Sequence, residues 1–250
     1  MKKTNHYIAL IVIFIMCSCQ KETSQEDVTA VSSKKSDWLT ASLDSKFASS
    51  QKEVTAYLFP TNEMTALVKT PDIEQVSFVL GYADNTIQIE VIGVDKSGKR
   101  LGIVKSTILK ESNYDAQLTQ LNELSLSKTS KRTALLNEHL LLPSDAIAGI
   151  EAWKEKLNKV SDLDEITSYE GSRFRSFSIE SDVIEAMVNK SNKNIGLFLG
   201  LNPKGKVTTI LIGLDENNAI KKASLTSKVV DDVYDATRPC PPNGDPEDPQ

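Results

Sequence analysis

The chain has 250 residues, a formal net charge of −5 at pH 7, three cysteines and two histidines. Because its lysines and arginines are scattered through an acidic sequence, it lacks the basic surface that binding to phosphate backbones requires, and we expect no nucleic-acid partner. With so few histidine and cysteine ligands, we expect neither a transition-metal site nor another cofactor.

The first predicted element, residues 1–18, is a secretory signal peptide. Two lysines precede an apolar run that is too short to cross a bilayer as a mature helix. The run ends in Met16-Cys17-Ser18-Cys19, which resembles a bacterial lipobox and implies cleavage before Cys19 and a diacylglyceryl lipid on its thiol. Two alternatives stay open. Lipidation of Cys17 would put bulky Met16 at the cleavage point, and an uncleaved signal would serve as an N-terminal anchor.

Residues 19–35 form the next predicted segment, a polar tether. As a flexible chain it would reach about 20 Å on average, so the folded part is expected to stay near the membrane. Its start, Gln20-Lys21-Glu22 followed by Glu26-Asp27, resembles the acidic stretch of surface-exposed lipoproteins of the Bacteroidota type. The sequence therefore predicts a cell-envelope protein of the outer membrane. Because any solvated tether is polar, this stretch does not decide whether the protein lies on the surface or on the periplasmic face.

The remainder of the chain predicts two copies of one unit, over residues 36–116 and 144–236. A shift of 120 residues aligns the copies, except for one block that needs 119. We therefore expect an α+β fold made of two tandem repeats. The matching segments are Ala66-Leu67-Val68 with Ala186-Met187-Val188, Leu80-Gly81 with Leu199-Gly200, Ile92-Gly93-Val94-Asp95 with Ile212-Gly213-Leu214-Asp215, and Tyr114-Asp115-Ala116 with Tyr234-Asp235-Ala236.

Each copy carries the same order of predicted elements. An extended piece precedes a helix, and Thr61 and Ser181 are the residues expected to cap these helices. Two strands with alternating apolar residues follow as a hairpin, and a third strand follows a tight turn. An amphipathic helix with a tryptophan, Trp38 or Trp153, begins each copy and precedes the extended piece. Each repeat is therefore expected to be a small antiparallel sheet with a helix on one face.

Two positions in each copy are candidate site residues. Gly93 and Gly213 lie inside predicted strands, where glycine marks a bulge or the close approach of another backbone; the alternative is the floor of a pocket. Asp95 and Asp215 follow these strands and are expected to accept hydrogen bonds from the amides of their own turns. The structural role is the favoured interpretation for all four residues.

Two further segments lie outside the copies. Residues 117–143 are rich in leucine and contain no glycine, which predicts two short helical pieces. Residues 237–250 are acidic and rich in proline, which predicts a disordered tail. Cys240 in this tail would be either a plain thiol or a partner in an intermolecular disulfide.

The Leu-Gly strands, the Ile-Gly-(Val/Leu)-Asp strand ends and the closing Tyr-Asp, followed by Pro-Cys-Pro-Pro, resemble small secreted Bacteroidota proteins that usually carry one such unit. The resemblance covers residues 54–116 and 174–240. It implies the fold of each unit but no catalytic residues, because no activity is established for that group. Those proteins tend to have a second cysteine two residues beyond the prolines, where this chain has Gly244.

No set of reactive residues in the sequence indicates catalysis. His139, the one histidine after the signal peptide, is expected on a solvated helix, and no nucleophile-elbow sequence accompanies it. The leading hypothesis is therefore a non-catalytic module that binds a protein or glycan ligand, in an oligomeric state that stays open. The alternative is a carboxylate-dependent hydrolase or carbohydrate-active accessory protein with a site between the two units, which would need two carboxyl groups about 5 to 10 Å apart. A third possibility is a scaffold in which one unit covers the binding surface of the other.

Overall fold

The computed structural model describes residues 37–111, 114–119, 121, 133–190, 192–220, 233–235 and 238–243. The predicted signal peptide, Cys19 and the predicted tether lie outside these residues, so their roles stay predictions. None of the described helices is long and apolar enough to span a membrane.

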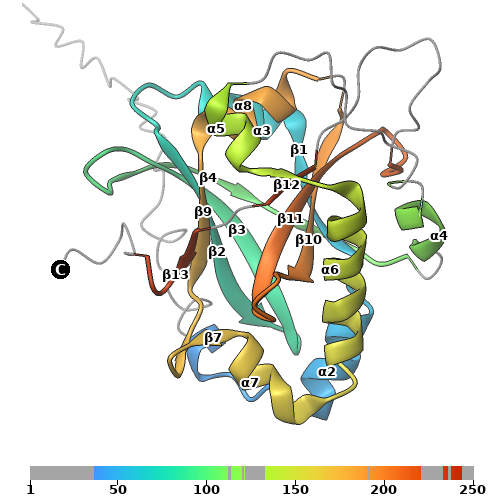
Figure 1. The fold of residues 1–250 in the computed structure, drawn as a ribbon. Coiled ribbons are helices and arrows are strands. Elements are labelled where there is room, and N and C mark those ends of the chain that lie inside the picture. Colours follow the sequence, from blue (N-terminus) through green and yellow to red (C-terminus); the bar gives the residue numbers. More distant parts are fainter. Residues whose placement is uncertain are drawn as a thin grey trace, which may run out of the picture.

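The fold is α+β, as predicted, and most of its strands belong to two antiparallel sheets (Figure 1). The six-stranded sheet has the order β5 (Thr107–Leu109), β1 (Ala56–Pro60), β10 (Asn194–Leu201), β11 (Val207–Leu214), β12 (Val233–Asp235) and β6 (Leu140–Leu141). The five-stranded sheet has the order β13 (Arg238–Cys240), β9 (Ser176–Glu180), β2 (Gln75–Ala83), β3 (Thr86–Val94) and β4 (Arg100–Lys105). A separate hairpin pairs β7 (Ser168–Tyr169) with β8 (Ser172–Arg173).

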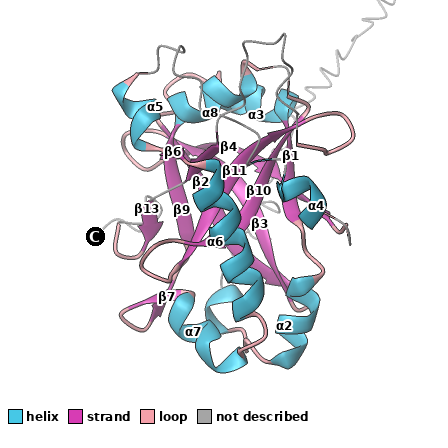
Figure 2. Ribbon diagram, turned by 45° about the vertical axis from the view of Figure 1, so that its right-hand side comes forward, coloured by secondary structure: helices cyan, strands magenta, loops and turns pink. Residues whose placement is uncertain are grey.

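Helices lie along one side of the sheets and at both of their ends (Figure 2). The long helix α6 (Pro143–Lys156) packs on β10, where a Cβ atom at Gly149 would lie 2.9 Å from the carbonyl oxygen of Leu201. Glycine at this position therefore lets the helix approach the sheet closely. The other helices are α3 (Thr61–Val68), α5 (Ala134–Glu138) and α8 (Ser181–Val188) at the upper end in Figure 2, α2 (Ser45–Lys52), η2 (Val160–Asp162) and α7 (Leu163–Ile166) at the lower end, and α4 (Asp115–Leu118).

The first strand of each half pairs with the hairpin of the other half. In the six-stranded sheet, β1 pairs with β10 and places Tyr57 opposite Leu197. In the five-stranded sheet, β9 pairs with β2 and places Phe177 opposite Phe78. This differs from the prediction of a separate small sheet in each half. The prediction missed the exchange because alternation along a strand shows which face is buried, but not which strand lies alongside.

The main hydrophobic core contains residues from both halves. Phe59 and Phe78 pack with a ring separation of 6.0 Å, and Phe174 and Phe177 with a separation of 5.6 Å. Trp38 belongs to the same core, and its indole nitrogen donates a hydrogen bond to the carbonyl oxygen of Phe174 at 2.6 Å. A second core fills the space between α6 and the six-stranded sheet. Because the main core is shared, neither half has a complete core of its own.

Helices α3 and α8 begin at the predicted residues but without the predicted caps. No side chain caps the first turn of either helix. Instead, the amide of Thr61 donates to the carbonyl oxygen of Lys193, and that of Ser181 donates to the carbonyl oxygen of Glu74, both at 2.9 Å. The first amide of each helix is therefore hydrogen-bonded to a backbone carbonyl of the opposite half, and this contact replaces the expected side-chain cap.

The beginning of the proline-rich tail is ordered, so the prediction of disorder is wrong for residues 238–243. Strand β13 pairs with β9, and it brings Cys240 opposite Ser176. The tail can form a strand despite Pro239 because β13 lies at the edge of its sheet, where the missing N–H of proline is tolerated. The Cys240 side chain is buried, so its thiol is not presented for an intermolecular disulfide. Residues 244–250 lie outside the described chain.

Candidate functional site

Gly93 and Gly213 are positions of close packing. A Cβ atom at Gly93 would overlap the side chain of Ile73, and one at Gly213 would overlap the side-chain amide of Asn192. The pairing of β3 with β4 also shifts register between Gly93 and Val94. Neither glycine lines any of the pockets described below, so the geometry at both positions is that of a packed strand.

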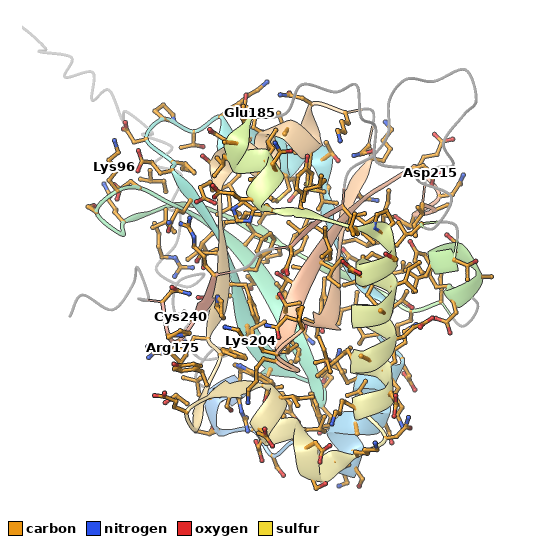
Figure 3. The ribbon with its side chains drawn as sticks, viewed as in Figure 1. Lys96, Arg175, Glu185, Lys204, Asp215 and Cys240 are labelled. Atoms are coloured by element: carbon orange, nitrogen blue, oxygen red, sulfur yellow. The ribbon has the colours of Figure 1, made fainter. Side chains whose placement is uncertain are left out.

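Asp95 and Asp215 each organise a turn. Asp95 Oδ1 accepts hydrogen bonds from the amide and hydroxyl of Ser97, at 2.8 and 2.7 Å, and from a second turn amide at 2.9 Å. The Ser97 hydroxyl bond is the largest cause that lowers the pKa of the Asp95 carboxyl. Asp215 Oδ1 accepts in the same way from two turn amides. Lys96, next to Asp95, and Asp215 lie on opposite sides of the molecule in Figure 3, so the two carboxyl groups do not form a shared site.

His139 is buried, although the sequence predicted a solvated position. Its side chain is 3% exposed and lies between the ends of the two sheets. Nε2 lies 2.7 Å from Glu180 Oε2 at the end of β9, and Nδ1 lies 3.1 Å from the carbonyl oxygen of Asp235 in β12. Arg238 of β13 forms an ion pair with the other oxygen of Glu180. The three strands converge only in the folded chain, so no sequence spacing could have revealed this cluster.

The Asp235 side chain is the most perturbed carboxyl group in the described chain. Thr208 Oγ1 donates a hydrogen bond to Asp235 Oδ1 at 2.6 Å. Burial, opposed by this bond and by the charge of His139, raises the pKa of the carboxyl to about 6. Among the described residues, no donor contacts the second carboxyl oxygen. Carboxyl groups with such shifts concentrate at functional sites, which makes Asp235 a candidate site residue that the sequence analysis had treated only as part of a repeat.

A pocket of about 440 Å³ opens beside Asp235, and we call it the β11–β13 pocket. Its inner wall contains the buried side chains of Phe174, Phe177 and Val207. Lys204 stands at its mouth on the turn between β10 and β11, while Cys240 and Arg175 mark the β13 side of the molecule in Figure 3. The full lining is Tyr169, Phe174, Phe177, Asn202, Pro203, Lys204, Lys206, Val207, Thr208, Asp235, Pro239, Pro242 and Asn243.

Two other large pockets are lined mainly by charged residues, and most of these form ion pairs. In a pocket of about 470 Å³, Asp164 pairs with Arg173 and Glu165 with Lys206. A pocket of about 600 Å³ is similar, with ion pairs that join Lys110 to Glu53 and Lys154 to Asp115. Within the described ranges, no three histidine, cysteine or acidic residues are grouped so that they could hold a metal ion.

No family model matches this chain, and neither a curated protein nor a solved structure is significantly similar to it. The resemblance to small Bacteroidota proteins therefore stays a prediction from the sequence.

Proposed function

We propose that this protein is a cell-envelope lipoprotein, anchored through a lipid on Cys19, whose folded part is a non-catalytic binding module. The lipobox-like end of the signal sequence supports the anchor. The β11–β13 pocket supports the binding role, and it is the observation that carries the proposal. On this view the ligand enters from the solvent beside the membrane and is held between the ends of the two sheets.

The character of the pocket suits binding of a small molecule or a short segment of a larger one. Its volume of about 440 Å³ lies within the usual range of ligand pockets, roughly 300 to 1,000 Å³. Tyr169, Pro203 and Pro239 offer apolar area, and Thr208 and Asp235 provide polar groups at one end. A mostly apolar pocket with few polar groups can orient a ligand and bind it selectively.

We also propose that the two halves arose by duplication of one unit. The support is the equivalent pairing of β1 with β10 and of β9 with β2, in which Tyr57 and Phe177 occupy corresponding positions at the predicted shift. The amides of Thr61 and Ser181 likewise donate to corresponding carbonyl oxygens of the opposite half. Among the described residues, the β11–β13 pocket is lined by residues 169–243, while the 600 Å³ pocket contains Val54 and Asp115, the counterparts of Phe174 and Asp235; there Asp115 is paired with Lys154, so the two pockets differ in charge.

A carboxylate-dependent hydrolase is the second candidate, and the raised pKa of Asp235 is the observation that favours it. However, Asp235 is the one carboxyl group among the described residues that line the pocket. Glu180, which is linked to Asp235 through His139, is held by Arg238 as well. A hydrolase of the two-carboxylate type would lack a second free carboxyl group here, so binding is the better supported function.

The binding function is tested by identifying what the protein retains from the cell envelope. The intact lipoprotein, purified in detergent, would be incubated with a small-molecule extract of envelopes, washed and denatured, and the released compounds identified by mass spectrometry. Lys204→Trp places a bulky ring at the pocket mouth, and Lys52→Trp is a matched control beside the charged 600 Å³ pocket. We expect a compound that the wild type and Lys52→Trp release and Lys204→Trp does not. Identical release from all three proteins would contradict the proposal.

A further inference from the structure

Asp235 brings a carboxyl group to the β11–β13 pocket without an ion-pair partner among the described lysines and arginines. Its Oδ1 accepts from Thr208, and no described lysine or arginine forms an ion pair with either carboxyl oxygen. Its neighbour His139 contacts the Asp235 backbone carbonyl and Glu180 rather than the Asp235 carboxyl group. A desolvated carboxylate is stabilised when a cation or several hydrogen-bond donors replace the lost water.

The other cations near the pocket are occupied or exposed. Lys206 donates to the carbonyl oxygen of Glu165 at 2.7 Å, and Arg238 pairs with Glu180. Lys204 is exposed at the mouth, and it forms no ion pair with Asp235. Apart from the charge of His139, which contacts the backbone and not the carboxyl group, no described cation complements Asp235, and a bound cation would do so.

The apolar wall sets the second requirement on a ligand. Tyr169, Pro203, Pro239 and Pro242 are the apolar lining residues with exposed or half-buried surface, whereas Phe174 and Phe177 are each at most 2% exposed and lie in the core. A polar body such as a phosphate would lose its hydration against this wall without gaining hydrogen bonds. An aromatic or aliphatic body would gain apolar contact there while a charged end reached Asp235.

We infer that the β11–β13 pocket binds a primary ammonium group carried on an apolar body, with the ammonium on Asp235 and the body against Tyr169 and the prolines of the lining. The ammonium group supplies three donors and one positive charge, and the second oxygen of Asp235 can accept one of these donors. This inference rests on the proposed binding function and names its ligand class. The same chemistry occurs in a free small amine and in the N-terminal residue of a peptide.

Calorimetric titration of the intact, detergent-solubilised protein tests this inference. The probes are 2-phenylethylamine, the neutral 2-phenylethanol, the anionic phenylacetate, and a tetrapeptide with N-terminal phenylalanine in its free and acetylated forms. We expect the amine to bind at least tenfold more tightly than the neutral and anionic probes. If the free peptide binds as tightly as the amine and the acetylated peptide does not bind, the site is specific for peptide N-termini. If the amine binds and neither peptide binds, the site is specific for small amines.

Two variants separate a binding role of Asp235 from a folding role. Asp235→Asn keeps an oxygen that can accept from Thr208 and removes the charge, so it should weaken amine binding at least tenfold and leave 2-phenylethanol unaffected. Asp115→Asn is the matched control, because Asp115 occupies the corresponding position of the first half and is exposed. Equal binding of the amine and the neutral probe would overturn the ammonium inference and leave the binding function standing. Failure of every probe to bind would also overturn the inference, and the envelope-extract experiment would then decide the function separately.

Discussion

His139 Nε2 lies 2.7 Å from Glu180 Oε2, and this contact ties the segment before β6 to the end of β9. It joins the six-stranded sheet to the five-stranded sheet at one end of the molecule. Arg238 pairs with the same carboxylate, so strand β13 is held at the same point. The cluster therefore fixes the position of the two strands, β12 and β13, that border the β11–β13 pocket.

Replacing His139 should destabilise the fold. His139→Ala removes a buried ring and leaves Glu180 and the carbonyl oxygen of Asp235 without their partner, which should lower the free energy of unfolding by roughly 2 to 3 kcal/mol. Urea unfolding measures this change. Glu138→Ala, at the exposed neighbouring position, should change the free energy by less than about 0.5 kcal/mol. Equal stability of the two variants would contradict the structural role of His139.

Asp235 should make stability depend on pH. Its folded pKa of about 6 exceeds the ordinary value of 3.8, so between these values the native state binds more protons than the unfolded state. The contribution of Asp235 to the free energy of unfolding therefore falls as pH rises from about 4 to 6, and it stays unfavourable above that range. Asp235→Asn should remove this dependence and, at pH 7.5, raise the free energy of unfolding by up to about 3 kcal/mol. Unfolding curves at pH 4.5 and 7.5 test this, and a variant with the same pH slope as the wild type would refute it.

An alanine at Gly93 should be destabilising because it crowds Ile73. We expect Gly93→Ala to lower the free energy of unfolding by about 1 to 3 kcal/mol. Ile73→Val removes the Cδ1 atom that a Cβ at Gly93 would overlap. In a double-mutant cycle, Ile73→Val should therefore recover part of the loss. If the effects of the two substitutions on the free energy of unfolding are additive, contact with Ile73 is not the reason that Gly93→Ala is destabilising.

Unfolding should occur in a single transition, although the sequence predicts two copies of one unit. Strands β1 and β9 each pair with the opposite half, and the main core contains residues of both halves. Trp38 and Trp153 offer one fluorescent reporter for each half. Single-tryptophan variants, Trp153→Phe and Trp38→Phe, should each show the same denaturant midpoint by fluorescence as by circular dichroism. Different midpoints for the two probes within one variant would contradict the shared core.

The described part of the tail should contribute to stability. A chain ending at residue 237 lacks β13 and the Arg238 partner of Glu180, and it should be less stable than a chain ending at residue 243. The buried thiol of Cys240 provides a second measurement. In the intact chain it should react with a maleimide much more slowly in buffer than in urea. Rapid reaction in buffer would show that β13 does not remain paired with β9.

Local sequence patterns predicted where the strands of this fold lie better than they predicted which strands pair with each other. Alternating apolar residues correctly placed the hairpins β2–β3 and β10–β11, because the period of two depends only on neighbouring positions. The exchange of β1 and β9 between the sheets depends on contacts far apart in the sequence, such as Tyr57 with Leu197, 140 positions apart, and Phe177 with Phe78, 99 positions apart. Composition around Pro239 indicated disorder, although an edge strand accommodates this proline.

The candidate site was predicted less well than the fold. Asp95 and Asp215 attracted attention because they recur at the predicted shift, and both make turn contacts far from the pocket. Asp235 recurs in the same way, as the counterpart of Asp115, but its raised pKa depends on Thr208, His139 and the surrounding strands. The sequence therefore marked Asp235 as a repeated residue, and only the folded environment distinguishes it from its exposed counterpart.

Metabolic labelling decides whether a lipid on Cys19 holds this module at a membrane. Cells that express the intact gene, Cys17→Ala or Cys19→Ala would be fed a labelled fatty acid, and the protein would be isolated and its label measured. We predict label in the wild type and in Cys17→Ala and none in Cys19→Ala, and external protease would then show which face of the membrane carries the module. An unlabelled wild type, or a Cys19→Ala variant that keeps its label, would contradict the account.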